Sequence, residues 1–250
     1  TNTTTWISGD SDGLLTITGG EVIPGKKGGT NFTGSLLVGH ATTGTLSSAT
    51  FNTGIGIGTL DAITTADHNV AIGASAATTL DTSPNNVIIG SQTANALVGG
   101  NGSNVLIGKS AGYNNVSGAY NVFIGESSGA STSGSTNNYN VGIGRRALQN
   151  ITTGEYNIAL GQSSGDNITT GSGNVVIGKA DVSSATGDDQ LSISDGEDGS
   201  VVWLTGDSSG NVTMTLAANQ ITSTQLTSAV SLQILSSDGT VVKTLYGAGS

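Results

Sequence analysis

The chain has 250 residues and a formal net charge of −10, with 40 glycines and no cysteine. The lack of cysteine excludes disulfides, thiolate metal ligands and a cysteine nucleophile, and seven Lys and Arg residues cannot form the basic stripe that nucleic-acid binding needs. Only 10% of the residues are charged, whereas disordered chains usually combine low hydrophobicity with high charge. We therefore expect a thin β-structure with many turns, and no membrane insertion, because no apolar run approaches the roughly 18 residues of a span.

The first segment, residues 1–34, contains short apolar stretches separated by glycine and aspartate. The run WISGDSDGLLTITGG, from Trp6 to Gly20, is typical of it. This spacing predicts β-hairpins. We treat the segment as a separate N-terminal part because a repeated phrase begins at Ser35.

Residues 35–180 repeat the phrase Asn-Val-x-Ile-Gly about every seventeen residues. The closing glycines stand at positions 39, 58, 73, 90, 108, 125, 144, 161 and 178, so the steps range from 15 to 19 residues. A fixed period with tolerated insertions is the signature of a solenoid, in which each repeat is one coil. Clear copies of the phrase begin at Asn69, Asn86, Asn104, Asn121, Asn140, Asn157 and Asn174.

Each repeat is expected to form one flattened coil of a parallel β-roll, of either hand. The β-branched start favours a short strand, and the closing glycine suits a corner with positive φ. A second weak strand is predicted where NITTG occurs, with Ile151 and Ile168 at matching positions. The repeated Asn is expected to form a ladder of hydrogen-bonded side chains along the stack.

Alternation along the strand places Val and Ile of the phrase on one face and x on the other. We expect the Val and Ile face to fill the coil interior. The x position is also mostly apolar, and a strand that is apolar on both faces is buried on both. The sequence therefore predicts a homotrimer around a three-fold axis, with x at the trimer interface. The interface residues predicted in this way are Leu37, Ile88, Leu106, Phe123 and Val176.

The last segment, residues 181–250, is expected to be a small β-rich tip or connector. Its irregular sequence around Trp203 to Tyr246 is the first candidate for receptor binding, because regular coils offer few concave pockets. The acidic residues Asp188, Asp189, Asp195, Glu197 and Asp198 are either a solvated loop or a cation site.

A second candidate surface lies in the repeats. Tyr120, Tyr139 and Tyr156 each precede the repeat Asn, so they should stack as a surface ladder. Exposed aromatic rings can hold sugar rings, and the simpler alternative is stacking that stiffens the turn.

Catalytic chemistry is not evident in the sequence. His40 and His68 lie far apart in the repeats, and catalysis or metal binding needs further ligands close by. A sugar hydrolase needs two facing carboxylates, and Glu126 and Glu155 would meet only if coils or subunits aligned them. We predict no catalytic residue, no metal site and no cofactor.

Four phrases carry a family resemblance: NVAIGASA from Asn69, NVLIGKSAG from Asn104, NVFIGESSG from Asn121 and NIALGQSSG from Asn157. They resemble the head repeats of trimeric autotransporter adhesins and, more closely, the repeats of bacteriophage tail fibres. The stretch from Asp188 to Val212 is similar to the part of phage fibres that precedes a C-terminal intramolecular chaperone.

The resemblance implies a rigid homotrimeric tail-fibre segment in the virion, outside the cell. Its expected partners are other phage tail or baseplate proteins and a bacterial surface glycan or protein. Two alternatives remain open at this point, a tailspike that hydrolyses polysaccharide and a bacterial trimeric adhesin head.

Overall fold

The computed structural model describes residues 25–39, 43–132 and 134–215, and the strands Ile7–Gly9, Leu15–Ile17, Ser231–Leu235 and Val241–Tyr246. The fold is all-β, and no helix occurs among these residues. The chain divides into two compact units, Thr1–Thr213 and Met214–Ser250. The boundary expected at residue 180 lies inside the first unit, because the sheet of the repeats continues beyond it.

Each end of the chain contributes an antiparallel strand pair. In the first unit, β1 (Ile7–Gly9) pairs with β2 (Leu15–Ile17), in line with the hairpin expected there. In the second unit, β16 (Ser231–Leu235) pairs with β17 (Val241–Tyr246).

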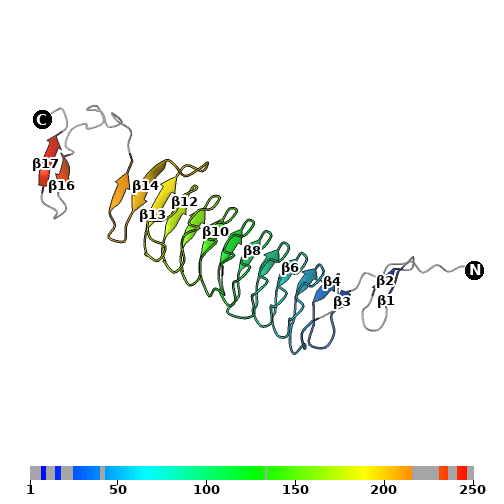
Figure 1. Ribbon diagram of the computed structural model, residues 1–250. Helices are drawn as coiled ribbons and strands as arrows, with labels where there is room; N and C mark the ends of the chain where they lie inside the picture. The colour runs from blue at the N-terminus through cyan, green and yellow to red at the C-terminus, as the bar shows by residue number, and fades with distance from the viewer. Residues whose placement is uncertain are drawn as a thin grey trace, which may run out of the picture. The chain divides into compact units, whose positions relative to one another are not determined.

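A sheet of 13 strands, β3 to β15, runs through the repeats in sequence order (Figure 1). Ten of its strands, β4 to β13, pair in parallel, and antiparallel β3 and β14 adjoin the two ends of this series. The strands are β3 (Gly25–Lys27), β4 (Leu36–Val38), β5 (Thr53–Ile55), β6 (Val70–Ile72), β7 (Val87–Ile89), β8 (Val105–Ile107), β9 (Val122–Ile124), β10 (Val141–Ile143), β11 (Ile158–Leu160), β12 (Val175–Ile177), β13 (Leu191–Ser194), β14 (Val202–Gly206) and β15 (Val212–Met214).

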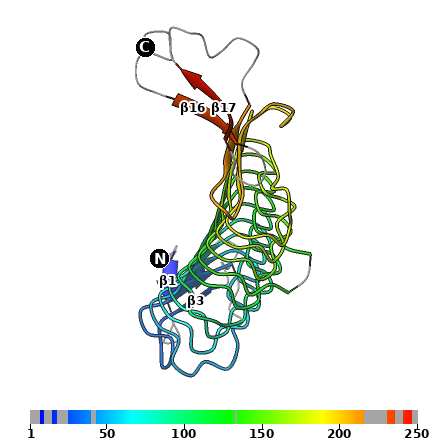
Figure 2. The ribbon, with the colours of Figure 1, turned by 90° about the vertical axis from the view of Figure 1, so that its left-hand side faces the viewer.

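The predicted parallel solenoid with coils of about 17 residues is confirmed. Successive coils align motif position with motif position, so Val122 lies beside Val141 and Phe123 beside Gly142. In Figure 2 the coils appear one behind another. Parallel pairing follows because each coil returns the chain to the same side before the next strand begins.

The second strand expected around Ile151 and Ile168 does not form. Ile151 and Ile168 each come directly after a turn and belong to no strand, and both side chains are fully buried. Coils still bond to each other there, since the Thr152 amide donates to the Thr169 carbonyl over 2.8 Å. These coils therefore have one three-residue strand each, and tight turns make up the rest.

The structure reverses the predicted orientation of the strands. Position x points into the coil, and Val and Ile point outward. The five residues predicted at the trimer interface are all at most 1% exposed within a single chain: Leu37, Ile88, Leu106, Phe123 and Val176. The reason is parity, because x lies two residues after the repeat Asn and shares its strand face. The Asn is buried, so x is buried with it.

Side-chain volumes compensate inside the thin coil. Phe123 is the largest x residue, and glycines occupy the places around its ring. A Cβ on Gly129 would lie 2.3 Å from Phe123 Cδ2, and one on Gly142 would lie 3.0 Å from Phe123 Cδ1. The interior therefore has room for the Phe123 ring because glycines lie beside it, one in its own coil and one in the next.

The repeat asparagines form the expected ladder along the stack. Each buried Asn accepts two bonds at Oδ1 from the next Asn, one from its backbone amide and one from its Nδ2. For Asn121 and Asn140 these distances are 3.0 and 3.2 Å. Asn121 Nδ2 also donates to the Asn137 carbonyl over 2.9 Å. The ladder runs over Asn52, Asn69, Asn86, Asn104, Asn121, Asn140, Asn157 and Asn174 to Gln190.

Two constraints require glycine at the closing position of the phrase. The backbone has a positive φ there, and the backbone of the next coil approaches closely. Gly125 has a φ of 133°, and a Cβ there would lie 2.5 Å from the Gly144 carbonyl oxygen. The same approach recurs along the stack. A side chain at this position would separate the coils.

One coil is irregular. The repeat from Asn121 to Tyr139 is two residues longer than its neighbours. It contains the buried Asn137, and the preceding repeat contains the buried Asn115. Neither Asn137 Nδ2 nor Asn137 Oδ1 has a hydrogen-bond partner, and Asn115 Nδ2 also lacks one. These atoms form a polar defect in the interior, and among the described residues Asn167 Oδ1 is a further buried atom without a partner.

Candidate interaction surface

The outward Val and Ile side chains form an apolar face along the parallel strands. They are half-buried or exposed at every coil, with exposed fractions of 41% at Ile143, 40% at Ile158 and 38% at Ile177. Positions 2 and 4 of the repeats carry no charged residue between β4 and β12. We call this two-column stripe the apolar face.

One margin of the apolar face is formed by the residues that immediately precede the repeat Asn. We call it the tyrosine edge, and every member has a positive φ, so the corner itself imposes this backbone conformation. Its members are Phe51, His68, Asn85, Ser103, Tyr120, Tyr139, Tyr156, Gly173 and Asp189.

The three tyrosines form the ladder that the sequence predicts. Ring centroids of Tyr120 and Tyr139, and of Tyr139 and Tyr156, are 4.9 Å apart, with planes within 2°. Each tyrosine therefore has at least one ring face covered by a neighbouring ring, and Tyr139 has both faces covered. At the other end of the edge, the Phe51 and His68 rings lie 5.0 Å apart at a tilt of 30°.

The ladder stops after Tyr156. The next member of the edge is Gly173, which has no side chain, and Tyr156 is 59% exposed against 45% for Tyr139. The Asp189 carboxylate of the following coil takes this position instead, since its Oδ1 would lie 2.3 Å from a Cβ on Gly173. The row of rings thus ends at Tyr156, and a carboxylate lies at the next level of the edge.

Further acidic groups line the same margin. Glu155 precedes Tyr156 and accepts a 2.8 Å bond at Oε1 from Asn138 Nδ2. Asp188 precedes Asp189 and accepts the Ser172 amide over 2.8 Å. The end of the tyrosine edge nearest β13 is therefore acidic.

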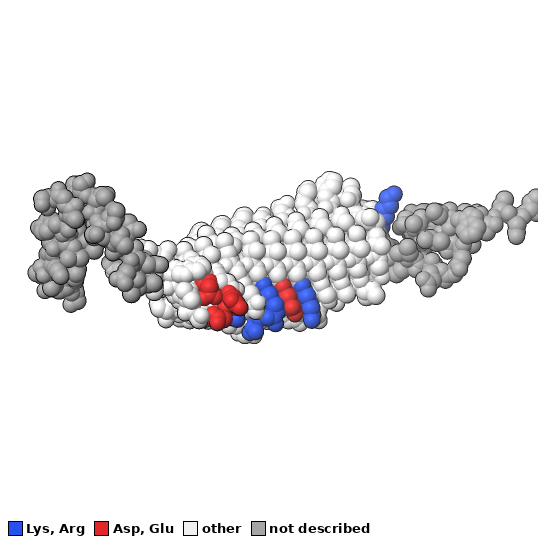
Figure 3. Space-filling view, turned by 90° about the horizontal axis from the view of Figure 1, so that it is seen from above, with Lys and Arg blue, Asp and Glu red and all other residues white. Residues whose placement is uncertain are grey.

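The opposite margin, which we call the charged edge, consists of the residues that follow the closing glycines. From β8 to β12 these residues are Lys109, Glu126, Arg145, Gln162 and Lys179. The edge thus has three cations and one anion in a chain of strongly negative charge. In Figure 3 most of the Lys, Arg, Asp and Glu side chains lie along one side, a cationic side chain lies apart from them, and most of the view is free of charge.

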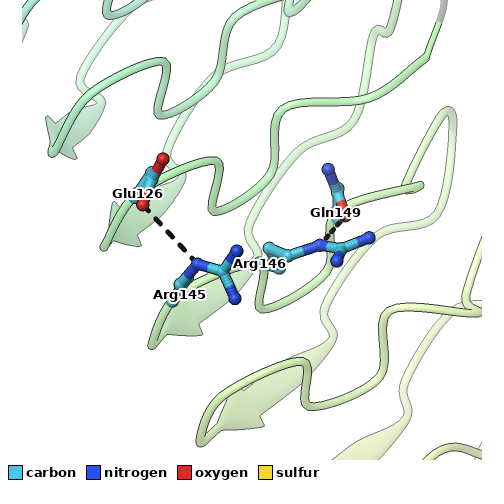
Figure 4. Close-up of polar contacts among 4 residues, drawn as sticks. All are labelled: Glu126, Arg145, Arg146 and Gln149. Carbon is cyan, nitrogen blue, oxygen red and sulfur yellow. Dashed lines mark hydrogen bonds and ion pairs between the residues drawn. The ribbon is translucent and has the colours of Figure 1, made fainter.

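Glu126 and Arg145 pair across neighbouring coils. Arg145 Nε lies 3.5 Å from Glu126 Oε2, and both side chains are about half exposed, at 54% and 52% (Figure 4). Arg146 turns away and donates from Nε to Gln149 Oε1 over 2.5 Å. Exposed pairs of this kind contribute little to stability, so Arg145 keeps an accessible charge.

The acidic loop after β13 is held by Asp195. Its Oδ1 accepts the amides of Glu197, Asp198 and Gly199 over 3.0 Å each, and its Oδ2 accepts the Val201 amide over 2.7 Å. These backbone bonds lower the pKa of Asp195 to about 2. The carboxylate thus closes the loop between β13 and β14.

The remaining candidate residues do not gather into one site. Trp203 is 49% exposed on β14, and Tyr246 ends β17, where its side chain lies outside the described residues. His40 is also outside them. Glu126 and Glu155 belong to opposite margins of the apolar face.

Metal clusters and membrane-spanning helices do not occur in the described part of the chain. The described residues contain no group of three or more His, Cys, Asp or Glu side chains placed to hold a metal ion. Nor, over these same ranges, is there a helix long and apolar enough to cross a membrane.

Comparison with known proteins gives no relative. No family model matches the chain, and neither a curated protein nor a solved structure matches it. We therefore infer a function from the fold, its surfaces and the repeat phrases.

Proposed function

We propose that this chain is a structural and adhesive segment of a bacteriophage tail fibre, which forms a rigid homotrimeric rod and contributes to attachment to the bacterial surface. The proposal combines the resemblance of the repeat phrases with the solenoid fold. Its setting is the virion, outside the cell, next to other tail or baseplate proteins.

The single observation that carries the proposal is the apolar face. Soluble monomers rarely expose a contiguous apolar stripe of this length. With strands about 4.8 Å apart, nine coils give a stripe roughly 38 Å long. Its Val and Ile columns replace the x residues as the predicted contact between copies.

Rigidity follows from the interior. A continuous parallel sheet, the Asn ladder and the closing glycines link every coil to the next, so stability accumulates along the stack. A rod of this kind suits a fibre that carries a receptor-binding part. Nothing in the site geometry favours the hydrolase alternative, so we make no second proposal.

Sedimentation of the full chain tests the rod. We expect a mass of three chains, and we expect Val122→Lys to yield smaller species because it places a charge in the apolar face. Thr153→Lys adds the same charge at an exposed position away from that face, and it should leave the trimer intact. A folded monomer in the unmodified protein would contradict the proposal.

Attachment is tested separately, with labelled protein and a panel of bacterial strains. We expect Tyr139→Ala to keep cell binding, because both faces of that ring are already covered by neighbours. Removal of residues after Thr213, the end of the first unit, should lower binding while the trimer persists. Unchanged binding by that trimer would place the receptor contact in the roll.

A further inference from the structure

We propose that the charged edge binds an acidic polysaccharide that lies along the solenoid axis, with its negatively charged groups held by Lys109, Arg145 and Arg146. This contact is additional to the one expected in the second unit. The inference rests on the attachment function proposed above, and it names the class of surface molecule that the repeats would bind.

The cationic side chains of the coils all lie at the charged edge. Each of them follows a closing glycine by one or two residues. Between β4 and β12 the Lys and Arg residues are Lys109, Arg145, Arg146 and Lys179. In a chain with a net charge of −10, this edge is therefore where a negatively charged ligand meets a local excess of cations, and a local field of that kind can attract it.

The two arginines are held so that their terminal nitrogens stay available. Arg145 Nε faces Glu126 Oε2 at 3.5 Å, and Arg146 Nε donates to Gln149 Oε1 over 2.5 Å. Figure 4 shows the terminal nitrogens of both guanidinium groups directed away from these partners. Neither group has a further ion pair or side-chain hydrogen bond among the described residues. Each can therefore donate two parallel bonds to a carboxylate or a phosphate.

Lys109 extends the site along the axis. Lys109 and Arg145 each follow a closing glycine directly and lie two coils apart, which is roughly 10 Å at about 4.8 Å per coil. Glu126 holds the same position in the coil between them, and its carboxylate repels a negative group at that level. The order of charges thus fits a ligand whose negative groups are separated by neutral units, such as a polysaccharide with an acid on alternate sugars.

A nucleic acid fits this order of charges less well. Its strand carries a phosphate at every nucleotide, so a strand that runs along the edge would place negative charge against Glu126. Like-charge contacts of this kind select against a ligand. The observations therefore favour a polysaccharide with spaced charges.

Lys179 lies at the same edge, but its charge is already engaged within the chain. The pKa of Asp198 is lowered chiefly by hydrogen bonds from the Ser200 side chain and amide, and attraction to Lys179 also lowers it. The row between Arg145 and Lys179 carries the neutral Gln162. We therefore place the end of the binding edge at Arg145 and Arg146.

The site stays accessible in the proposed rod. The apolar face is the predicted contact between copies, and the charged edge lies at its margin. Arg146 is one residue further from the strand than Arg145, and both side chains are exposed. Polar margins of protein interfaces remain open to solvent, so a long polymer can reach this edge in the assembled protein.

Binding of purified polymers to the full chain tests the ligand class by calorimetry. Hyaluronan carries a carboxylate on alternate sugars, and a glycerol teichoic acid carries phosphate instead, so the two probes distinguish the sources of charge. We expect at least one to bind, with an affinity that falls as salt is added. Hyaluronan with its carboxyl groups reduced to alcohols should bind at least about tenfold more weakly than hyaluronan itself if the carboxylate is the bound group.

Three results would overturn the inference. One is the absence of binding to both acidic polymers. Another is an affinity that does not fall with salt, because a contact made by aromatic rings and amides in a negatively charged protein would not weaken in this way. The third is binding of single-stranded DNA as tight as that of the acidic polysaccharide, which would indicate a site for any polyanion.

Variants that remove charge locate the contact. Arg145→Gln combined with Arg146→Gln should lower the association constant at least about tenfold, because two charge-assisted donors are lost. Glu126→Gln should raise it by about twofold to fivefold, because it removes a negative charge from the path of the ligand. Lys27→Gln is the control, since Lys27 is an exposed cation on β3 outside the charged edge, and it should change binding less than about twofold. An unchanged association constant in the arginine double variant, or weaker binding by Glu126→Gln, would contradict the site.

The outcomes distinguish the inference from the proposed function. Circular dichroism and sedimentation first establish that each variant keeps the fold and mass of the parent. If the arginine double variant binds both bacterial cells and the polymer as the parent does, attachment stands and the charged edge is not the contact. If the parent binds the polymer but no strain of the panel, the polysaccharide site stands and attachment fails.

Discussion

The two faces of the repeat strands carry apolar side chains under different constraints. On the inner face, the Phe123 ring is fully buried within its own chain, and glycines lie against it. On the outer face, Val122 and Ile124 stay partly accessible beside similar side chains from the neighbouring coils. The inner face determines whether the coil closes, whereas the outer face is free to serve contacts between molecules. Hydrophobicity alone therefore does not distinguish the core from the interaction surface in a coil this thin.

Substitution by lysine should give the largest difference in folding stability between the two faces. Phe123→Lys removes a buried ring and leaves an unpaired charge in the interior, which should cost more than about 5 kcal/mol of folding free energy. Val122→Lys should change the stability of the single chain by under about 1 kcal/mol. Chemical denaturation followed by circular dichroism measures both. A folded Phe123→Lys protein with near-normal stability would contradict the assignment of the inner face.

Substitution of a closing glycine should give the next largest loss of stability. Gly125→Ala combines a φ of 133° with a 2.5 Å approach to the Gly144 carbonyl oxygen, so we expect a loss of about 3 kcal/mol or more and disrupted pairing between the two coils. Gly196→Ala is the control, because a Cβ there meets nothing within 4 Å. Hydrogen exchange of the Val122–Ile124 amides would report the local opening. Equal protection in both variants would contradict the prediction.

Two buried asparagines should respond with opposite signs to the same substitution. Asn121→Ala breaks the ladder to Asn104 and Asn140 and should destabilise the chain by about 3–5 kcal/mol. Asn137→Ala removes a side chain without partners and should stabilise it by about 1 kcal/mol. Thermal unfolding of both variants gives the comparison. Destabilisation by Asn137→Ala would show that its amide is satisfied.

The smallest effect concerns pH and the loop after β13. The pKa of Asp195 is lowered from 3.8 to about 2 in the folded chain, so its stabilising contribution is present above about pH 4 and is lost as the pH falls towards 2. Asp195→Asn should flatten this part of the stability profile and leave the profile above pH 4 unchanged in shape. Carboxyl NMR titration should show the lowered pKa. A titration near 3.8 would contradict the loop geometry.

The repeat period was enough to predict the solenoid, because seven phrases in phase leave few other ways to place a strand and a glycine corner. The Asn ladder was likewise predictable, since coils that stack in register must stack their asparagines. The polar defect at Asn115 and Asn137 had only a weak signal, the two extra residues of that coil.

The orientation of the strands was predicted wrongly, although a signal was present. Asn and x share a face by parity, so a buried Asn requires a buried x. The prediction considered only the apolar character of Val, Ile and x. Because all three positions are apolar, hydrophobicity could not show which of them lies inside the coil. The second strand near Ile151 was also predicted wrongly. The composition favoured a strand there, but the chain forms turns in that part of the coil.

The sequence by itself determined the period, the parallel stacking, the ladder of asparagines and the row of tyrosines, because each is a local property repeated at fixed spacing. Only the tertiary structure decided which apolar column lies inside. Closing a narrow coil forces one face against the turns of the same chain, and packing volume then selects x beside the buried Asn. The structure also decided that the Asp189 carboxylate lies beside Gly173, where a side chain of that residue would begin, since these two coils meet there only after they have stacked.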